Sequence, residues 1–399
     1  MGDSRRTFLK KMVLASAPAL KEPDKGTIVC VFLRGGADTL NMIYPYGDPQ
    51  YYKVRPTLAI PKPGSGTNAG VKLDDFFALH PKLSGLQPIF SAGELCFIQA
   101  VGTDNPTGSH FEVQDQMEHG EAFARTIGGG WLGRYLRTRS SNKLTPLSAV
   151  AIGSSVPESF RGAPVTSVIK KIEDINMAAP SGCTDAFCKA LASMYDGVQA
   201  GILNAPGEAT LDLLKRVERL RKQNYKPENG ASYGDDEFSA GLKEVARLIK
   251  ADVGLEVACV DLGGWDTHFV QGGAEGQQAV LIEQLGKGLS AYWKDLSRHN
   301  QKVTTIVMTE FGRRTYENGS LGTDHGRGFT FMALGAGVKG GKVYGTYPGL
   351  QDDQYELGPG GLKITCDYRR VLAEILSVRQ APISEIFPDY DPEPVGFMS

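Results

Sequence analysis

The stretch GGWDTH places an acid and a histidine two residues apart, at Asp266 and His268. Alternate residues of an extended chain face the same way, so both side chains could reach one ion. An imidazole and a carboxylate together suit zinc, manganese or iron. The alternative is an Asx turn at Asp266 beside a solvated histidine. Spacing alone leaves a metal site and a polar loop equally open.

A second group of such residues lies further along the chain. Glu310 ends the apolar run TTIVMTE, and Asp324, His325 and Arg327 follow in the glycine-rich stretch GTDHGRG. Arg313 and Arg327 could clamp an anion with paired hydrogen bonds. The alternative is a set of surface salt bridges, which contribute little. We favour the functional interpretation because each of these polar clusters follows an apolar run.

The earliest cluster is RGGADTLN, which contains Arg34, Asp38 and Asn41. The paired glycines let the backbone turn sharply, so Asp38 is expected to point above the preceding strand. Asp38 is a candidate functional residue there, and Arg34 and Asn41 are candidates for contacting the substrate. The alternative is that Asp38 or Thr39 caps the helix that follows.

Ser109 lies at the predicted start of a helix, in the stretch NPTGSHFEVQDQMEHG. Backbone N–H donors and the positive end of the helix dipole favour a phosphate or sulfate ester there. Ser109 is the candidate nucleophile if a metal lowers its pKa, and His110 is expected to contact the substrate. The alternative, which the spacing by itself favours, is a capping box formed with Glu112.

Apolar runs and amphipathic segments show how these residues are positioned. The runs predict strands at 28–33, 95–102, 147–153, 255–264, 304–312 and 329–338. Helical patterns lie at 110–124, 184–198, 211–225, 238–252, 279–296 and 368–376. Strands that alternate with helices indicate an α/β domain with a doubly wound, mostly parallel sheet flanked by helices. Active sites in such sheets form at the carboxyl ends of the strands, where the polar clusters lie.

Composition sets broad limits on the function. The chain has 399 residues, 22% of them charged, which is ordinary for a soluble globular protein. Its formal net charge of -2 gives no field that would favour nucleic acid, so none is expected as a partner. The segment from about 155 to 245 is helical and charged, which predicts a helical insertion within a domain spanning 23–399. Of the six cysteines, Cys183 and Cys188 are spaced for a local disulfide.

The N-terminus predicts export. The run SRRTFLKK is followed by the short apolar run MVLASAPAL with small residues. Basic, apolar and small-residue regions in this order indicate an export signal, and the paired arginines indicate the twin-arginine type. We therefore expect a signal segment at 1–22, transport by the twin-arginine machinery, and a periplasmic or secreted location. The apolar run is too short to span a bilayer.

The motifs resemble a known family. FLRGGAD-x-LN, HPKL, SHFE-x-QD, GGWDTH, TEFGR and DHGRG occur in this order. The order resembles the exported bacterial proteins grouped as the domain of unknown function family 1501, over residues of about 27 to 345. That family is allied to the alkaline phosphatase and sulfatase superfamily. Its members are metal-dependent phospho- and sulfo-hydrolases built on a doubly wound sheet.

The resemblance implies roles for individual residues. Asp38 looks like the metal ligand after the first strand, Ser109 like the nucleophile, and Asp266 and His268 like a later ligand pair. Where the superfamily has an Asp-His pair after a late strand, this chain has Glu310 followed by Phe311.

His325, with Asp324 beside it, looks like the further ligand of the superfamily. The resemblance thus implies one metal centre formed by Asp266, His268 and His325. A second centre would use Asp38, Glu310 and Ser109 without a histidine, and oxygen ligands suit magnesium, calcium or manganese better than zinc.

Two functions follow as hypotheses. The first is an exported hydrolase of small-molecule or polymer phosphate or sulfate esters, with one or two divalent ions (zinc, manganese, magnesium or calcium). Ser109 would attack, and Arg34 or Arg313 would bind the anion. The alternative is a non-catalytic envelope protein that uses the same fold to bind a protein partner or another ligand. Phe311, at a ligand position, motivates this alternative.

Overall fold

The computed structural model describes residues 26–139, 144–175, 186, 189–190, 193, 214–351, 360–388 and 390–399. The predicted signal segment at 1–22, and Cys183 and Cys188, lie outside these residues. Within the described part, no helix is both long enough and apolar enough to cross a membrane.

A large sheet forms the centre of the molecule. Among the described residues it has nine strands, in the order β11-β5-β10-β9-β1-β8-β6-β7, with β12 also paired to β5. Their bounds are β1 Thr27–Leu33, β5 Leu95–Gly102, β6 Ala149–Ile152, β7 Ser167–Ile169, β8 Val257–Leu262, β9 Val303–Thr309, β10 Phe329–Gly335, β11 Val343–Tyr344 and β12 Cys366–Asp367. β10 runs antiparallel to both of its neighbours, and the other pairings are parallel. The predicted mostly parallel sheet is confirmed.

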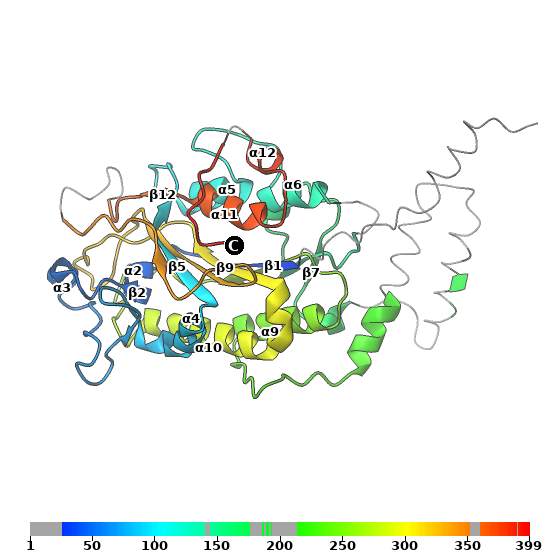
Figure 1. The fold of residues 1–399 in the computed structure, drawn as a ribbon, viewed down its shortest axis with the longest axis horizontal. Coiled ribbons are helices and arrows are strands. Elements are labelled where there is room, and N and C mark those ends of the chain that lie inside the picture. Colours follow the sequence, from blue (N-terminus) through cyan, green and yellow to red (C-terminus); the bar gives the residue numbers. More distant parts are fainter. Residues whose placement is uncertain are drawn as a thin grey trace, which may run out of the picture.

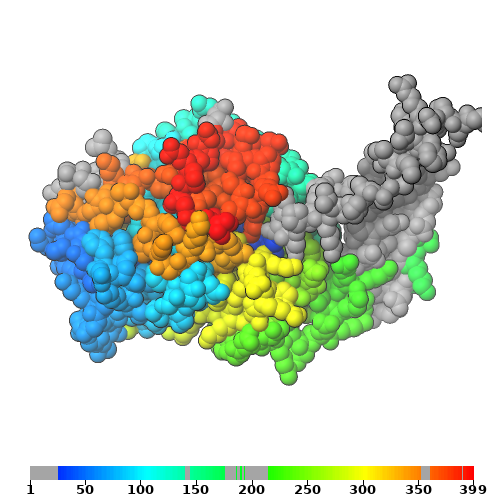
Figure 2. All heavy atoms as spheres, viewed as in Figure 1, coloured from blue at the N-terminus to red at the C-terminus, as the bar shows by residue number. Residues whose placement is uncertain are grey.

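Helices cover both faces of this sheet (Figure 1). One face carries α5 (His110–His119), α6 (Trp131–Arg137), α11 (Tyr368–Ser377) and α12 (Ile383–Ile386). The other carries α4 (Gln87–Ser91), α9 (Glu237–Lys250) and α10 (Gln277–Leu296). Figure 2 shows the same division, with the C-terminal segment (red) on one side and the α9 and α10 region (light green to yellow) on the other.

The central strand β1 shows why the apolar runs form this sheet. Ile28, Cys30 and Phe32 belong to the core on the α5 face, and the alternate residues Val29 and Val31 belong to the core on the α10 face. Every residue of β1 is buried. A parallel strand covered on both faces is therefore a continuous apolar run.

Several smaller elements were not predicted from the sequence. They are α2 (Thr39–Met42), α3 (Pro49–Val54), a small sheet of β2 (Ile43–Tyr44), β4 (Ala78–Leu79) and β3 (Val71–Lys72), and 3₁₀ helices at Pro81–Leu86, Glu158–Phe160, Ile172–Asp174 and Ser297–Lys302. Within the predicted insertion, β7 extends the main sheet and α9 packs on β8. Much of the remainder lies outside the described residues, so the insertion stays a prediction.

Asp295 ties the segment before α9 to α10. Its buried carboxylate accepts hydrogen bonds from the Tyr225 hydroxyl (2.7 Å), the Tyr233 hydroxyl (2.9 Å), the Glu228 amide (2.8 Å) and the Lys250 ammonium (2.9 Å). Burial acts to raise the pKa of Asp295, but these hydrogen bonds outweigh it and hold the pKa below its ordinary value. The carboxylate is thus stabilised in its ionised form.

This network predicts a pH-dependent stability. Because the folded-state pKa is depressed, the stabilisation is present above the unfolded pKa of about 3.9 and is lost as the pH falls through the folded value. We expect Asp295→Asn to lower the free energy of unfolding at pH 7 by about 1–3 kcal/mol, and to weaken its acid dependence. Urea titrations at neutral and acidic pH measure the free energy of unfolding and its pH dependence. Asp75→Asn, at an exposed carboxylate, is the control. A variant with the wild-type acid dependence would contradict this role.

Candidate metal centre

Loops at one edge of the sheet carry the polar clusters. β1, β5, β8 and β9 all run in the same direction, so the loops that follow them leave at the same edge. The loop from β9 to the antiparallel β10 returns to that edge. Segments far apart in the sequence therefore meet where open α/β sheets bind their ligands.

Three imidazoles surround one carboxylate oxygen at this edge. The Oδ1 atom of Asp266 lies 3.0 Å from Nε2 of His268, 3.0 Å from Nε2 of His325 and 3.4 Å from Nε2 of His110. The Nε2 atoms of His268 and His325 are themselves 3.0 Å apart. The structure thus brings together the three residues predicted for one centre, and adds His110, which was expected to contact the substrate.

The other ring nitrogens of two of these histidines face carboxylates. Nδ1 of His110 lies 2.8 Å from Oε1 of Glu310, and Nδ1 of His268 lies 3.0 Å from Oδ1 of Asp324. An ionised carboxylate can only accept hydrogen bonds, so each Nδ1 carries the proton. These tautomers follow from the hydrogen-bond network.

His325 is oriented by a backbone group. Its Nδ1 lies 2.8 Å from the carbonyl oxygen of Gly108, which also only accepts, so this Nδ1 is protonated too. In their neutral forms all three rings therefore present Nε2 lone pairs to the Asp266 oxygen, another acceptor. Nε2 of His110 is buried and has no hydrogen-bond partner among the described residues. Acceptors gathered around an acceptor are accommodated either by a cation between them or by a proton on Nε2.

The charges around the imidazoles point the same way. Asp266, Glu310 and Asp324 contribute three carboxylates, and Arg313 contributes one guanidinium, whose Nη2 donates to Oδ1 of Asp266 over 2.7 Å. A divalent cation would balance the two negative charges that remain.

The pKa shifts reflect these contacts. Burial raises the pKa of Asp266, but its close contacts with Arg313 and His325 outweigh burial and hold the pKa well below its usual range. The hydrogen bond to Glu310 raises the pKa of His110. Burial lowers the pKa of His325. Desolvation therefore disfavours an imidazolium at His325, at the centre of the cluster.

Arg313 holds the loops together. Its buried guanidinium donates to the backbone oxygens of Gly35 (2.5 Å), Gly36 (2.5 Å), Trp265 (3.0 Å) and Thr323 (2.9 Å), as well as to Asp266. These contacts join the loops after β1, β8 and β9. The prediction that Arg313 binds a substrate anion is therefore corrected, because all three of its guanidinium nitrogens are engaged within the protein.

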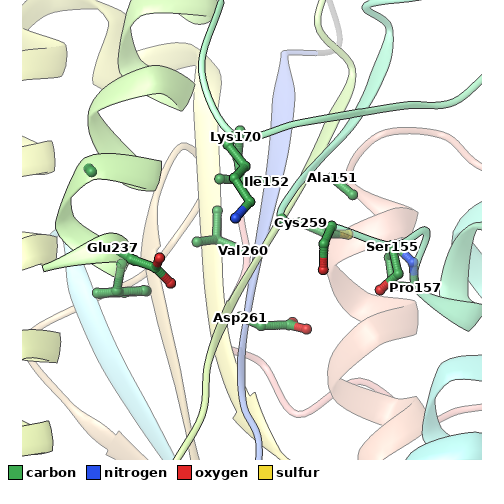
Figure 3. Close-up of a pocket in the computed structure, with 13 residues that line it drawn as sticks. Ala151, Ile152, Ser155, Pro157, Lys170, Glu237, Cys259, Val260 and Asp261 are labelled. Atoms are coloured by element: carbon green, nitrogen blue, oxygen red, sulfur yellow. The ribbon is translucent and has the colours of Figure 1, made fainter. Parts of the chain in front are cut away.

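Arg34 is also engaged internally. It forms ion pairs with Glu118 (2.8 Å) and Asp261 (3.1 Å) and donates to Gln114 (3.3 Å), so four of its five N–H groups are engaged within the protein. Asp261 also lines a cavity of about 340 Å³ beside the imidazole cluster, with Lys170 and Glu237 (Figure 3). Arg327 donates to the backbone oxygen of Thr103 over 3.2 Å, close to the loop that leads to α5.

Asp38 forms a buried ion pair instead of facing the imidazoles. Its two carboxylate oxygens accept from Arg55 over 2.5 and 3.0 Å, and Gln271 donates a further hydrogen bond over 2.7 Å. The side chains of Asp38 and Arg55 are both 0% exposed. Asn41 accepts from Arg55 and from the Tyr51 hydroxyl in the same network. The predicted metal and substrate roles of Asp38 and Asn41 are corrected to a structural one.

Glu310 orients other groups of the site. Besides its contact with His110, its carboxylate accepts from the amide of Gly35 (2.9 Å), the side chain of Gln114 (2.8 Å) and the Thr309 hydroxyl (3.0 Å). Its predicted role as a metal ligand is therefore corrected to one of positioning His110. Asp324 takes the same role towards His268.

Phe311 provides the wall behind the imidazoles. Its buried ring lies 4.9 Å from the His110 ring and 4.8 Å from the His325 ring, between centroids.

Ser109 is the N-cap of α5, and its hydroxyl accepts weakly from the Glu112 amide over 3.5 Å. Ser109 therefore lies between Gly108, which orients one imidazole, and His110, which supplies another.

A second group of potential ligands lies on the same helix. Asp115 and His119 of α5 approach Glu158, and their ligand atoms lie within 4.8 Å of one another, as do those of His110, Asp266 and His325. Nδ1 of His119 lies 2.9 Å from the backbone oxygen of Asp115, four residues earlier in α5. This group has one imidazole where the first cluster has three.

Fold and site together define an α/β protein with an imidazole–carboxylate cluster at the carboxyl edge of its sheet. Residues 25–358 match the family model described as "Protein of unknown function (DUF1501)". The chain belongs to this family. A search of curated proteins found no match.

Solved structures that align with the chain are of the alkaline phosphatase and sulfatase type. The Ps i-CgsB structure has a TM-score of 0.39 and 9% identity, covering 89% of this chain and 72% of that one. The alkaline phosphatase of the Antarctic bacterium TAB5 has a TM-score of 0.31 and 10% identity, covering 80% and 94%. A 2-O GAG sulfatase has a TM-score of 0.34 and 9% identity, covering 88% and 70%. These scores are too low to support an argument about activity.

The buried ion pair predicts a large effect of one substitution. Arg55→Met leaves the Asp38 charge buried without its partner, so we expect the free energy of unfolding to fall by about 3–5 kcal/mol. Urea denaturation measures it. Lys72→Met, which removes an exposed ion pair with Asp75, is the control and should change stability by less than about 1 kcal/mol. Equal effects of the two substitutions would contradict the structural role of Arg55.

Proposed function

We propose that this protein is an exported, metal-dependent hydrolase of phosphate or sulfate esters, acting in the periplasm or outside the cell. One observation carries the proposal: three imidazoles, each with Nδ1 bound to an acceptor, direct Nε2 at the carboxylate of Asp266. The proposed ligands of a single ion are His110, Asp266 and His325, whose ligand atoms lie within 4.8 Å of one another. His268, whose Nε2 lies 3.0 Å from the Asp266 oxygen, is the candidate for a fourth position.

The donor set fits a metal ion. Zn–N bonds of about 2.0–2.1 Å in a tetrahedral site place neighbouring ligands about 3.3 Å apart, close to the 3.0–3.4 Å separations from the Asp266 oxygen. Ligating histidines usually donate their other N–H to a carboxylate or carbonyl oxygen, as all three do here. Nitrogen-rich ligation favours zinc over magnesium, calcium or manganese.

One ion is favoured over two. Asp38, expected at a second centre, is already neutralised by the Arg55 guanidinium, and Glu310 is occupied by four donors. The Arg55 guanidinium thus pairs with the carboxylate at which a second metal was expected.

Ser109 is proposed as the nucleophile. When bound, a divalent cation polarises the ester and lowers the pKa of a hydroxyl next to it. Ser109 directly precedes the proposed ligand His110 in the chain. The first amide groups of α5 and its dipole favour the anionic group of the substrate there. Arg327, which donates to the Thr103 oxygen of the loop leading to α5, is proposed as a further contact of the anion.

The alternative is a non-catalytic envelope protein that binds a partner. It is supported by Arg34 and Arg313, whose guanidinium groups are engaged within the protein, and by Phe311 at a position expected to supply a ligand. Metal would then have a structural role. Hydrolysis of an ester by the purified protein distinguishes the hydrolase from the non-catalytic binding protein.

Metal binding is the first test. Equilibrium dialysis against zinc, followed by elemental analysis, should find one ion per chain. We expect His325→Ala to abolish retention and Glu310→Gln to weaken affinity about 10–100-fold through loss of orientation. His119→Ala is the matched control, because His119 lies on α5 between two carboxylates. If His325→Ala retained zinc and His119→Ala lost it, the metal site would be the group of Asp115, His119 and Glu158 instead.

The nucleophile is tested separately. Ser109→Ala should retain the metal, while kcat for phenyl phosphate or phenyl sulfate falls on the order of 10³-fold or more. Ser155→Ala, in the neighbouring cavity, is the control and should be neutral. An unchanged kcat in Ser109→Ala would remove Ser109 from the mechanism. If the metal-loaded wild type hydrolyses neither ester, the non-catalytic alternative is favoured.

A further inference from the structure

Large apolar side chains are exposed beside the imidazole cluster. Phe111 is 88% exposed, Phe269 70%, Val270 68% and Leu321 49%. We refer to these four residues as the apolar rim. Contiguous exposed apolar surface is uncommon on soluble proteins and marks binding sites.

The chain places two rim residues next to imidazoles of the cluster. The imidazoles of His110, His325 and His268 lie in a row in space. The ring centroids of His110 and His325 are 4.3 Å apart, and those of His325 and His268 are 4.7 Å apart. Phe111 directly follows His110 in the chain, and Phe269 directly follows His268. The Phe269 ring lies 6.4 Å from the His268 ring, between centroids, and Phe111 lies in the first turn of α5 next to His110.

The other two rim residues lie beside Phe269. The amide of Val270 donates to the Ser320 oxygen over 3.0 Å, and the amide of Gln271 donates to the Leu321 oxygen over 2.9 Å. The side chain of Asn318 joins the two segments further by donating to the His268 oxygen over 3.0 Å. Val270 and Leu321 are thus neighbours on paired segments that both lead to metal ligands.

The backbone holds two rim residues in an unusual conformation. φ is +44° at Val270 and +58° at Leu321, in the left-handed region that bulky side chains seldom adopt. Such a conformation costs on the order of 1–3 kcal/mol and persists where the surrounding structure imposes it. Here the pairing with the 318–323 segment imposes it and keeps the rim exposed.

We infer that the apolar rim binds the hydrocarbon part of the ester, while the metal centre binds its anionic group. The inference rests on the proposed function and specifies its substrate class: phosphate or sulfate esters of aromatic or long-chain alcohols. A small anion at the imidazoles would leave the rim in water, whereas an aryl or alkyl group attached to that anion would cover it. Burial of this apolar surface is favourable.

Binding of non-hydrolysable phosphonates to the zinc-loaded protein tests the inference. Methylphosphonate and 2-naphthylphosphonate share the anionic group and differ in apolar area. We expect calorimetry to show at least about tenfold tighter binding of the naphthyl compound. The double substitution Phe111→Ala and Phe269→Ala should remove most of that preference and leave methylphosphonate affinity unchanged.

Val378→Ala is the matched control. Val378 is 41% exposed, and its neighbour Arg379 donates to the Thr27 oxygen at the opposite end of β1. This control should keep the full preference, and unchanged thermal unfolding should show that all variants are folded.

The outcomes separate the inference from the proposed function. Hydrolysis of phenyl esters with equal affinity for the two phosphonates would overturn the rim inference and leave the function standing. A naphthyl preference that depends on Phe111 and Phe269, without hydrolysis of any ester, would support the rim and reject the function. If the double variant keeps the preference but loses self-association or vesicle binding seen in the wild type, the rim binds a second copy or a membrane surface, and the inference is overturned.

Discussion

The site depends on one electrostatic constraint: three imidazole acceptors meet at the acceptor oxygen of Asp266. Each ring is fixed in this orientation from behind, by Glu310, Asp324 or the Gly108 carbonyl. Without a cation these lone pairs would repel one another. The hydrogen bonds on the far side of the rings thus fix the orientation on which the proposed metal centre depends.

The loops are held in place by cations of the protein itself. Arg313 joins the loops after β1, β8 and β9 through backbone oxygens, and Arg55 neutralises Asp38 below them. Both guanidinium groups are buried, so they act as fixed parts of the scaffold. This arrangement fixes the loops around the proposed metal centre.

Much of the fold could be predicted from the sequence. The six long strands are buried apolar runs, and alternation with helices determines that most of them are parallel. The direction of β10 could not be predicted, because an apolar run looks the same in either direction. The small sheet β2-β4-β3 has strands of two residues, which are too short to leave a periodic pattern.

The site was predictable in part. Asp266, His268 and His325 follow strand ends, so parallel topology brings them together. The partner of Asp38 could not be predicted, since Arg55 lies 17 residues away in the chain and meets it only through tertiary packing. His110 was expected to contact the substrate, because the sequence does not show that Glu310 turns its ring towards Asp266.

The most direct test of the metal centre is the anomalous scattering of zinc in crystals of the zinc-loaded protein. A peak about 2.0–2.1 Å from Nε2 of His325, shared with the Asp266 carboxylate and the other two imidazoles, is the predicted result. An ion bound only by Asp115, His119 and Glu158, or no ion within bonding distance of the His325 ring, would contradict it.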